Sequence, residues 1–304
     1  MGGGARKIDT TQKLSWSEIF QNAKKRALGG GLAGAAAMGI QVGSLMWLRT
    51  TMNYQYRYGG SSMQAVRALY ADGGIPRFYR GVMFALVQGP MSRFGDTAAN
   101  SGALSILNGM EETKDLPIAA KTSVASVSAG LFRIFLMPVD TCKTIMQVEG
   151  SAGLKVLGAK IKTNGPTVLY HGALGAASAT AAGHYPWFLT FNLLDEYLFW
   201  KDGSFAQKMV RNGLNGLASS AVSDVVSNSL RVLKTYRQTA EVPVSYTVAA
   251  KTIIKNEGIT GLMFRGLGTR IIAHGINGIV FTVFWKILED EFFKDKQEET
   301  KPKV

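Results

Sequence analysis

An acid and a base that follow a proline are the residues of this sequence best suited to a chemical role. Pro138, Asp140 and Lys143 stand close together at the end of an apolar run. Proline lacks the backbone N–H and crowds the preceding turn, so we expect a helix to kink there. Asp140 and Lys143 are one helical turn apart and can face the same side of that helix. Ionisable side chains in an apolar setting need water or partners, which indicates a gate beside a polar cavity.

Two linked features of this segment recur three times along the chain, as expected for an internal repeat. A glycine that follows an aromatic residue and a base occurs at Gly81, Gly172 and Gly266. Counted from Ser44, Pro138 and Ser229, which open the three segments, these glycines follow after 37, 34 and 37 residues. Each segment also keeps a base and, four residues later, an amide. The bases are Arg49, Lys143 and Lys234, and the amides are Asn53, Gln147 and Gln238.

The pattern Pro-x-Asp-x-x-Lys-x-x-x-Gln resembles the signature of the mitochondrial carrier family, and the resemblance covers roughly residues 24–292. It implies an all-α membrane protein with six transmembrane helices in three pseudo-symmetric two-helix repeats, each with a short surface helix. We expect the repeats at residues 25–109, 116–200 and 204–292, between an N-terminal tail at 1–24 and a charged C-terminal tail at 293–304.

The composition is compatible with membrane helices but does not demand them. The chain has 304 residues, 35 of them glycine, and small residues suit the close packing of membrane helices. Its mean hydropathy is only +0.07. Residues 27–48 carry no charge, and residues 172–194 carry none beyond the titratable His184; both runs are long enough to span hydrocarbon. A soluble helical repeat protein with buried helices remains the alternative.

The charge distribution argues against a nucleic-acid-binding protein and orients the chain. The net charge is +13, but the bases are scattered through the loops and no aromatic–basic RNA-binding pattern occurs. The loops after the first, third and fifth expected spans are basic, whereas the other connections are nearly neutral. Basic loops stay on the electronegative side of a membrane. By the resemblance this side is the mitochondrial matrix, which puts both termini toward the intermembrane space.

No arrangement of residues predicts an enzyme. The three histidines stand apart, and neither a Ser/His/Asp order nor a phosphate-binding Gly-Lys-Ser loop occurs. No Cys/His spacing typical of a metal site is present, and Cys142 is the single cysteine, which excludes an intrachain disulfide. We therefore predict no catalytic residues, no cofactor and no bound metal.

Polar residues within the expected spans predict a cavity for a small charged solute. In the family that this chain resembles, the solute contacts lie on the even-numbered helices, some seven to twelve residues past the conserved glycine. Together with ionisable residues elsewhere in the spans, this gives the predicted substrate-binding set Gln88, Arg93, Arg133, His184, Asp224, Arg270, His274 and Asn277. Three of these residues are arginines, and they outnumber Asp96 and Asp224, which predicts an anion such as a carboxylate or a small phosphate ester. The alternative is that the charges pair with each other and only fix helix packing.

The predicted gate departs from the family pattern. Family members close the matrix side with salt bridges between the acid of one repeat and the base of the next, but here Met46 and Arg231 occupy two of the three acid positions. Asp140 is left to pair with Lys234, and Arg231 is expected to face Arg49. The full predicted gate set is Arg49, Asn53, Asp140, Lys143, Gln147, Arg231, Lys234 and Gln238.

Two functions from different classes follow. The first is secondary transport of a small anionic metabolite across the inner mitochondrial membrane by alternating access. The second is a carrier-fold protein that has lost alternating access and serves as a structural or interacting subunit. The expected partners are the solute and the lipid bilayer, with anionic lipid as a candidate; the protein is expected to be a monomer, or in the second case part of a larger membrane assembly.

Overall fold

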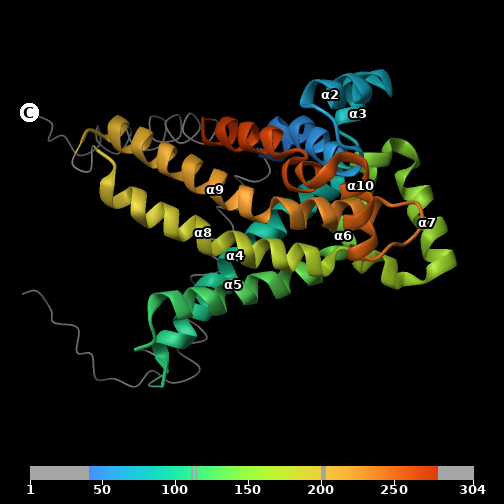
Figure 1. Cartoon of the computed structure of the whole chain (residues 1–304). Helices are drawn as coiled ribbons and strands as arrows, with labels where there is room; N and C mark the ends of the chain where they lie inside the picture. Colours follow the sequence, from blue (N-terminus) through green and yellow to red (C-terminus); the bar gives the residue numbers. More distant parts are fainter. Residues whose placement is uncertain (1–40, 111, 114, 200–202, 280–304) are drawn as a thin grey trace, which may run out of the picture.

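A computed structural model describes residues 41–279 apart from residues 111, 114 and 200–202. Within these residues the protein is entirely helical and contains no strand. Long helices lie side by side, and the shorter helices α2, α7 and α10 gather at one end of the molecule (Figure 1). The all-helical part of the predicted fold class is therefore confirmed.

The helices follow each other as three similar groups. The first group comprises a helix at residues 41–58, α2 (Ser62–Ala71), α3 (Gly74–Phe78) and α4 (Val82–Gly109). The second comprises α5 (Ile118–Phe135), α6 (Met137–Glu149), the 3-10 turn η1 (Gly150–Ala152), α7 (Gly153–Asn164), the 3-10 turn η2 (Pro166–Tyr170) and α8 (Ala173–Tyr197). The third comprises α9 (Phe205–Thr239), α10 (Tyr246–Phe264) and a helix at residues 267–279. The expected first and sixth spans lie partly outside the described residues, as do both predicted tails.

Serine side chains fix where several helices begin. Ser61 caps α2 and Ser204 caps α9: each serine side chain accepts a hydrogen bond from the backbone N–H three residues later. The glutamine at that later position accepts a hydrogen bond from the backbone N–H of the serine. These reciprocal bonds satisfy two backbone N–H groups that the helix leaves without partners. The sequence prediction of a surface helix after the first span is met by α2, and that of another before the sixth span by α10.

The proline of the signature breaks a helix as predicted. α5 ends at Phe135 and α6 begins at Met137, so Pro138 occupies the first turn of α6, where a missing N–H has no helical partner to lose. Segments Ser123–Phe135 and Met137–Asn164 lie at 67° to one another. The helix at residues 41–58 and α9 run unbroken through Ser44 and Ser229. Unlike proline, serine keeps its backbone N–H, so neither helix is interrupted at these residues.

In the described part of the chain, no single helix combines the length and the hydropathy that a membrane span requires. The bent pair on either side of Leu136 satisfies both requirements when taken together. α4, α8 and α9 are long enough, at 28, 25 and 35 residues, but carry many polar and small side chains. The prediction of six membrane-spanning helices is thus not established by the structure.

The three equivalent glycines occupy equivalent places. Gly81, Gly172 and Gly266 have φ angles of 82°, 97° and 64°, a left-handed conformation that glycine adopts without a steric penalty. A Cβ atom on each would lie 3.0–3.3 Å from a backbone carbonyl oxygen of the next group. For Gly266, the last of the three, that group is the first one. These carbonyl oxygens belong to Lys143, Lys234 and Met52. The three groups therefore pack head to tail around a closed circle.

A second contact also recurs three times. The carbonyl oxygen three residues before each of these glycines accepts a hydrogen bond from a polar side chain on the long helix that precedes it. Thr50 donates to Phe78 (2.6 Å), Thr141 donates to Leu169 (2.7 Å), and Asn228 donates to Met263 (2.8 Å). Each bond fixes the segment before the glycine against the long helix that precedes it.

Buried arginines join neighbouring groups in two of three places. Arg77 pairs with Asp72 at 2.5 Å and donates to the carbonyl oxygens of Gln147 and Val148. Arg265 pairs with Glu257 at 2.8 Å and reaches the carbonyl oxygen of Arg57. Both arginines thereby satisfy carbonyl groups at the end of a helix in another group, which have no helical partner.

The second group lacks this arrangement. Asn164 stands before Gly165 where Glu257 stands before Gly258, and these two glycines share a left-handed φ. The base before Gly172 is His171. Burial lowers the pKa of His171, and the nearby charges of Arg237 and Lys160 lower it further, so this side chain is neutral at pH 7.

Replacing Arg265 with glutamine tests the importance of these contacts. Glutamine cannot pair with Glu257, so we expect Arg265→Gln to lower the free energy of unfolding by about 3–5 kcal/mol, as for a buried ion pair that loses one partner. The matched control is Arg80→Gln at the equivalent position of the first group, where the arginine is exposed. Thermal unfolding in detergent should show a clear decrease for Arg265→Gln and almost none for Arg80→Gln. Equal effects would contradict this account.

Candidate solute cavity and gate

A polar cavity of about 570 Å³ lies between the long helices. Its lining comes from the helix at residues 41–58, from α4, α5, α6, α8 and α9, and from the helix at residues 267–279. Among the described residues, six bases and three carboxylates line it. The bases are Arg49, Arg133, Lys143, Arg231, Lys234 and Arg270, and the carboxylates are Asp96, Asp140 and Asp224. The cavity walls therefore carry three more positive than negative charges.

The three carboxylates are already paired with bases. Arg133 contacts Asp96 at 2.7 Å, between α5 and α4. Arg270 contacts Asp224 at 2.6 Å, and the Nε2 atom of His274 lies 3.3 Å from the other oxygen of Asp224. The alternative that charges in the spans pair and fix helix packing is thus supported for these two acids. Arg133 and Asp224 do not pair with each other.

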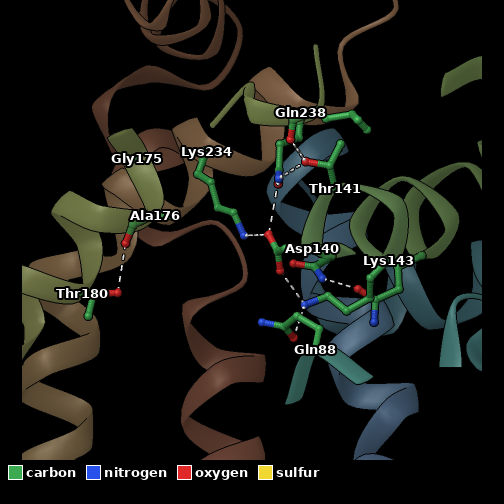
Figure 2. Close-up of polar contacts among 12 residues, drawn as sticks. Gln88, Asp140, Thr141, Lys143, Gly175, Ala176, Thr180, Lys234 and Gln238 are labelled. Atoms are coloured by element: carbon green, nitrogen blue, oxygen red, sulfur yellow. Dashed lines mark hydrogen bonds and ion pairs between the residues drawn. The ribbon is translucent and has the colours of Figure 1, made fainter. Parts of the chain in front are cut away.

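Asp140 lies between two lysines on different helices (Figure 2). Its Oδ1 atom accepts a hydrogen bond from Lys143 on α6 (2.7 Å), and its Oδ2 atom forms an ion pair with Lys234 on α9. Lys143 also donates to Gln88 on α4 (3.0 Å). The side chain of Asp140 is only 9% exposed, so these donors replace the water that its charge would otherwise require. The contact expected between Asp140 and Lys234 is present, and its role as a gate stays a prediction.

A layer of amides and hydroxyls joins the three groups just beyond this ion pair. Gln238 donates to Thr141 (3.0 Å) and to Asp140 (3.3 Å), and thus links α9 with α6 (Figure 2). Asn53 donates to Gln147 (2.6 Å), which links the first group with the second. The hydroxyl of Tyr56 donates to Asn228 (3.1 Å), which links the first with the third. Both glutamines are about 1% exposed, so their hydrogen bonds are buried.

The two positions that lack an acid differ in how they are filled. Met46 is fully buried, and its sulfur accepts a long contact of 3.5 Å from Gln147. Arg231 lines the cavity and donates from Nε to Ser227 on its own helix (3.2 Å). Arg49 also lines the cavity and donates to Gln41 on its own helix (2.7 Å). Arg49 and Arg231 were expected to face each other; both line this cavity, and each bonds to a side chain one or two turns away on its own helix.

The structure brings most of the predicted site residues together. Seven members of the predicted substrate-binding set line the cavity: Gln88, Arg133, His184, Asp224, Arg270, His274 and Asn277. The side chain of Arg93 lies outside the described residues, although its backbone is part of α4. The gate set lines the same cavity, except that Gln238 lies behind the wall. Their binding and gating roles remain predictions.

Sequence reasoning missed the uncharged residues that also line the cavity. Trp187 stacks on Phe191 at a centroid distance of 5.0 Å and donates to Ser220 (3.3 Å). Ser223 donates to the carbonyl oxygen of Gly183 (2.7 Å). The indole N–H of Trp187, three residues after His184 on α8, is the signal that would have pointed to this residue, because a buried N–H requires an acceptor.

Two further groups at the end near α7 have perturbed pKa values. Burial raises the pKa of Tyr58 to about 12, and Glu149, which accepts a hydrogen bond from its hydroxyl (3.1 Å), acts in the same direction. Burial lowers the pKa of Lys160, although the charge of Glu149 opposes this. Glu149 therefore interacts with two helices beyond its own, and holds the end of α6 in place.

Comparison with known families gives a match to part of the chain. Residues 205–296, the predicted third repeat, match the family model described as "Mitochondrial carrier protein". This region is therefore similar to the mitochondrial carrier family, and a match to only one part of the sequence fits a divergent member of that family. No curated protein matches the chain. A carrier domain supports a role in solute transport, and the family implies a multi-pass protein of the inner mitochondrial membrane.

Removing the carboxylate of Asp140 tests the central contact of the site. Asp140→Asn leaves the ammonium groups of Lys143 and Lys234 close together without an acid, and we expect a loss of about 3–5 kcal/mol in the free energy of unfolding. The matched control is Asp195→Asn. It removes a carboxylate that is 48% exposed and that pairs with Arg211. Arg211 keeps its bonds to the carbonyl oxygens of Leu198 and Asp195 in this variant, so the loss should be about 1 kcal/mol or less and thermal unfolding of the control should change little. An Asp140→Asn protein as stable as the control would contradict the proposed geometry.

Proposed function

We propose that the protein is a secondary carrier that moves a small anionic metabolite across the inner mitochondrial membrane by alternating access. The observation that carries this proposal is the excess of bases in the cavity. Each of the three carboxylates already has a basic partner, so the charge left to be balanced is positive. A cavity shielded from water strengthens the attraction of that charge for an anion.

The position of the Asp140–Lys234 pair supports alternating access. The pair joins α6 to α9, and the segments that follow these two helices lead to the end of the molecule where α7 and α10 gather (Figure 1). Opening this end requires the pair to separate, and a solute shifts such an equilibrium by binding one state more tightly than the other. The basic loops at this end favour the matrix side of the membrane, with both termini toward the intermembrane space.

Two observations favour the second function, a carrier-fold structural or interacting subunit. Met46 and Arg231 replace acids, so within the described residues a single ion pair joins neighbouring groups at the predicted gate. The carboxylates Asp96 and Asp224 are occupied by pairs that also fix helix packing. The monomeric carrier is our main proposal because a structural subunit has no need for an unbalanced polar cavity. An enzyme is not proposed, since members of the carrier family are transporters.

Reconstitution distinguishes the two functions. Purified protein in liposomes should take up at least one small anion, supplied as labelled phosphate or as labelled mono- and dicarboxylates, with saturable kinetics and without uptake of basic or neutral amino acids. Liposomes without protein and liposomes with the Asp140→Asn protein are the controls, and the variant should transport more slowly than the wild type. Uptake confined to cations or neutral amino acids would refute an anion carrier. No uptake of any solute, by protein that is folded, would favour the structural role.

A further inference from the structure

A small recess shares part of the wall of the main cavity. Its volume is about 60 Å³, and it lies between α5, α6, α8 and α9. Five of its lining residues also line the main cavity: Gln88, Arg133, Asp140, Arg231 and Lys234. The remaining wall is formed largely by Leu136, Met137, Ala176, Ala179 and Thr180. The space suits a few water molecules or one compact polar headgroup.

Three bases line this recess, and two of them are neutralised by an acid. Arg133 is paired with Asp96, and Lys234 is paired with Asp140. Arg231 forms no ion pair with any residue that the structure describes, and its one hydrogen bond runs from Nε to Ser227. The two terminal nitrogens of its guanidinium group are therefore not engaged by a described acid.

The nearby acid already has a basic partner. Asp224 lies two turns before Arg231 on α9, and its Oδ1 atom accepts the bond from Arg270 at 2.6 Å. Its side chain is 3% exposed, and its Oδ2 atom lies 3.3 Å from His274. Arg231 thus remains as positive charge in a partly buried setting, which costs free energy unless an anion or water balances it.

The guanidinium group defines the chemistry of a suitable ligand. It is planar and can donate two parallel hydrogen bonds, which match the oxygens of a carboxylate or a phosphoryl group. The short side chains of Ala176 and Ala179 leave room opposite for such a group. In the repeats, Arg231 stands where Asp140 stands in the second group, so the exchange of acid for base turns a gate position into an anion-binding position.

We propose that Arg231 anchors the anionic headgroup of the solute in this recess through its guanidinium group. The inference rests on the proposed function and adds the residue that determines anion specificity. Lys234 and Arg133 strengthen the attraction by their charge, and Gln88 and Thr180 add polar side chains to the wall.

Ligand-dependent thermal unfolding of purified protein tests this assignment. Inorganic phosphate and succinate are titrated separately at constant ionic strength maintained with chloride, which distinguishes a phosphoryl from a carboxylate headgroup. At least one of them should raise the melting temperature of the wild type in a saturable manner, because a ligand of the folded state stabilises it by mass action. Arg231→Gln should weaken the apparent affinity at least tenfold. Arg231→Lys keeps the charge but not the planar fork, so it should weaken the affinity less.

Two controls separate binding from folding. Arg211→Gln removes an arginine that bonds to Asp195 outside the cavity, and its anion affinity should equal that of the wild type. The melting temperature of Arg231→Gln without added anion should be no lower than that of the wild type, since the substitution removes an unbalanced charge. A wild-type shift that Arg231→Gln retains would overturn the inference, as would the absence of any saturable shift in the wild type. The proposed function fails separately, if reconstituted protein takes up no anion.

Discussion

The carboxylate of Asp140 binds the ammonium groups of Lys143 and Lys234, and the arrangement of the cavity depends on this contact. A carboxylate that is 9% exposed is stable only while donors surround it, so α6 and α9 must stay close wherever the ion pair persists. Next to this contact, Gln238 on α9 donates to Thr141 on α6. Lys143 also donates to Gln88, which connects the contact to α4. The break at Pro138 places Asp140 at this point, because α6 turns away from α5.

The three groups of helices are alike in backbone and unlike in charge. Gly81, Gly172 and Gly266 make equivalent contacts, and a carbonyl oxygen three residues before each accepts a side-chain hydrogen bond, although the donors occupy different positions in the three groups. Such contacts depend on the absence of a side chain or on short polar groups, and tolerate little change. The positions that face the cavity have diverged instead. A packing frame of this kind allows the polar lining to change while the helices keep their places.

The sequence was sufficient to predict the equivalence of Gly81, Gly172 and Gly266, the break at Pro138 and the pairing of Asp140 with Lys234, because each rests on a pattern with a fixed spacing. It did not predict that Arg133 pairs with Asp96 or that Asp224 pairs with Arg270, since partners on different helices depend on helix rotation. It also did not predict that Arg49 donates to Gln41 and that Arg231 donates to Ser227, although both arginines line the same cavity as expected. Arg77, rather than Arg80, is the buried base of the first group, and only burial distinguishes them.

A charge-swap cycle at Asp140 and Lys234 tests the central claim most directly. Asp140→Lys and Lys234→Asp are made singly and together, and the melting temperature and the rate of anion uptake are measured for each protein. Either single change places like charges side by side, whereas the double variant again has one acid facing two bases, one of them Lys143. We predict that both single variants lose stability and transport and that the double variant recovers most of both, with a coupling energy of about 1–3 kcal/mol. A double variant whose losses equal the sum of the single losses would contradict the account.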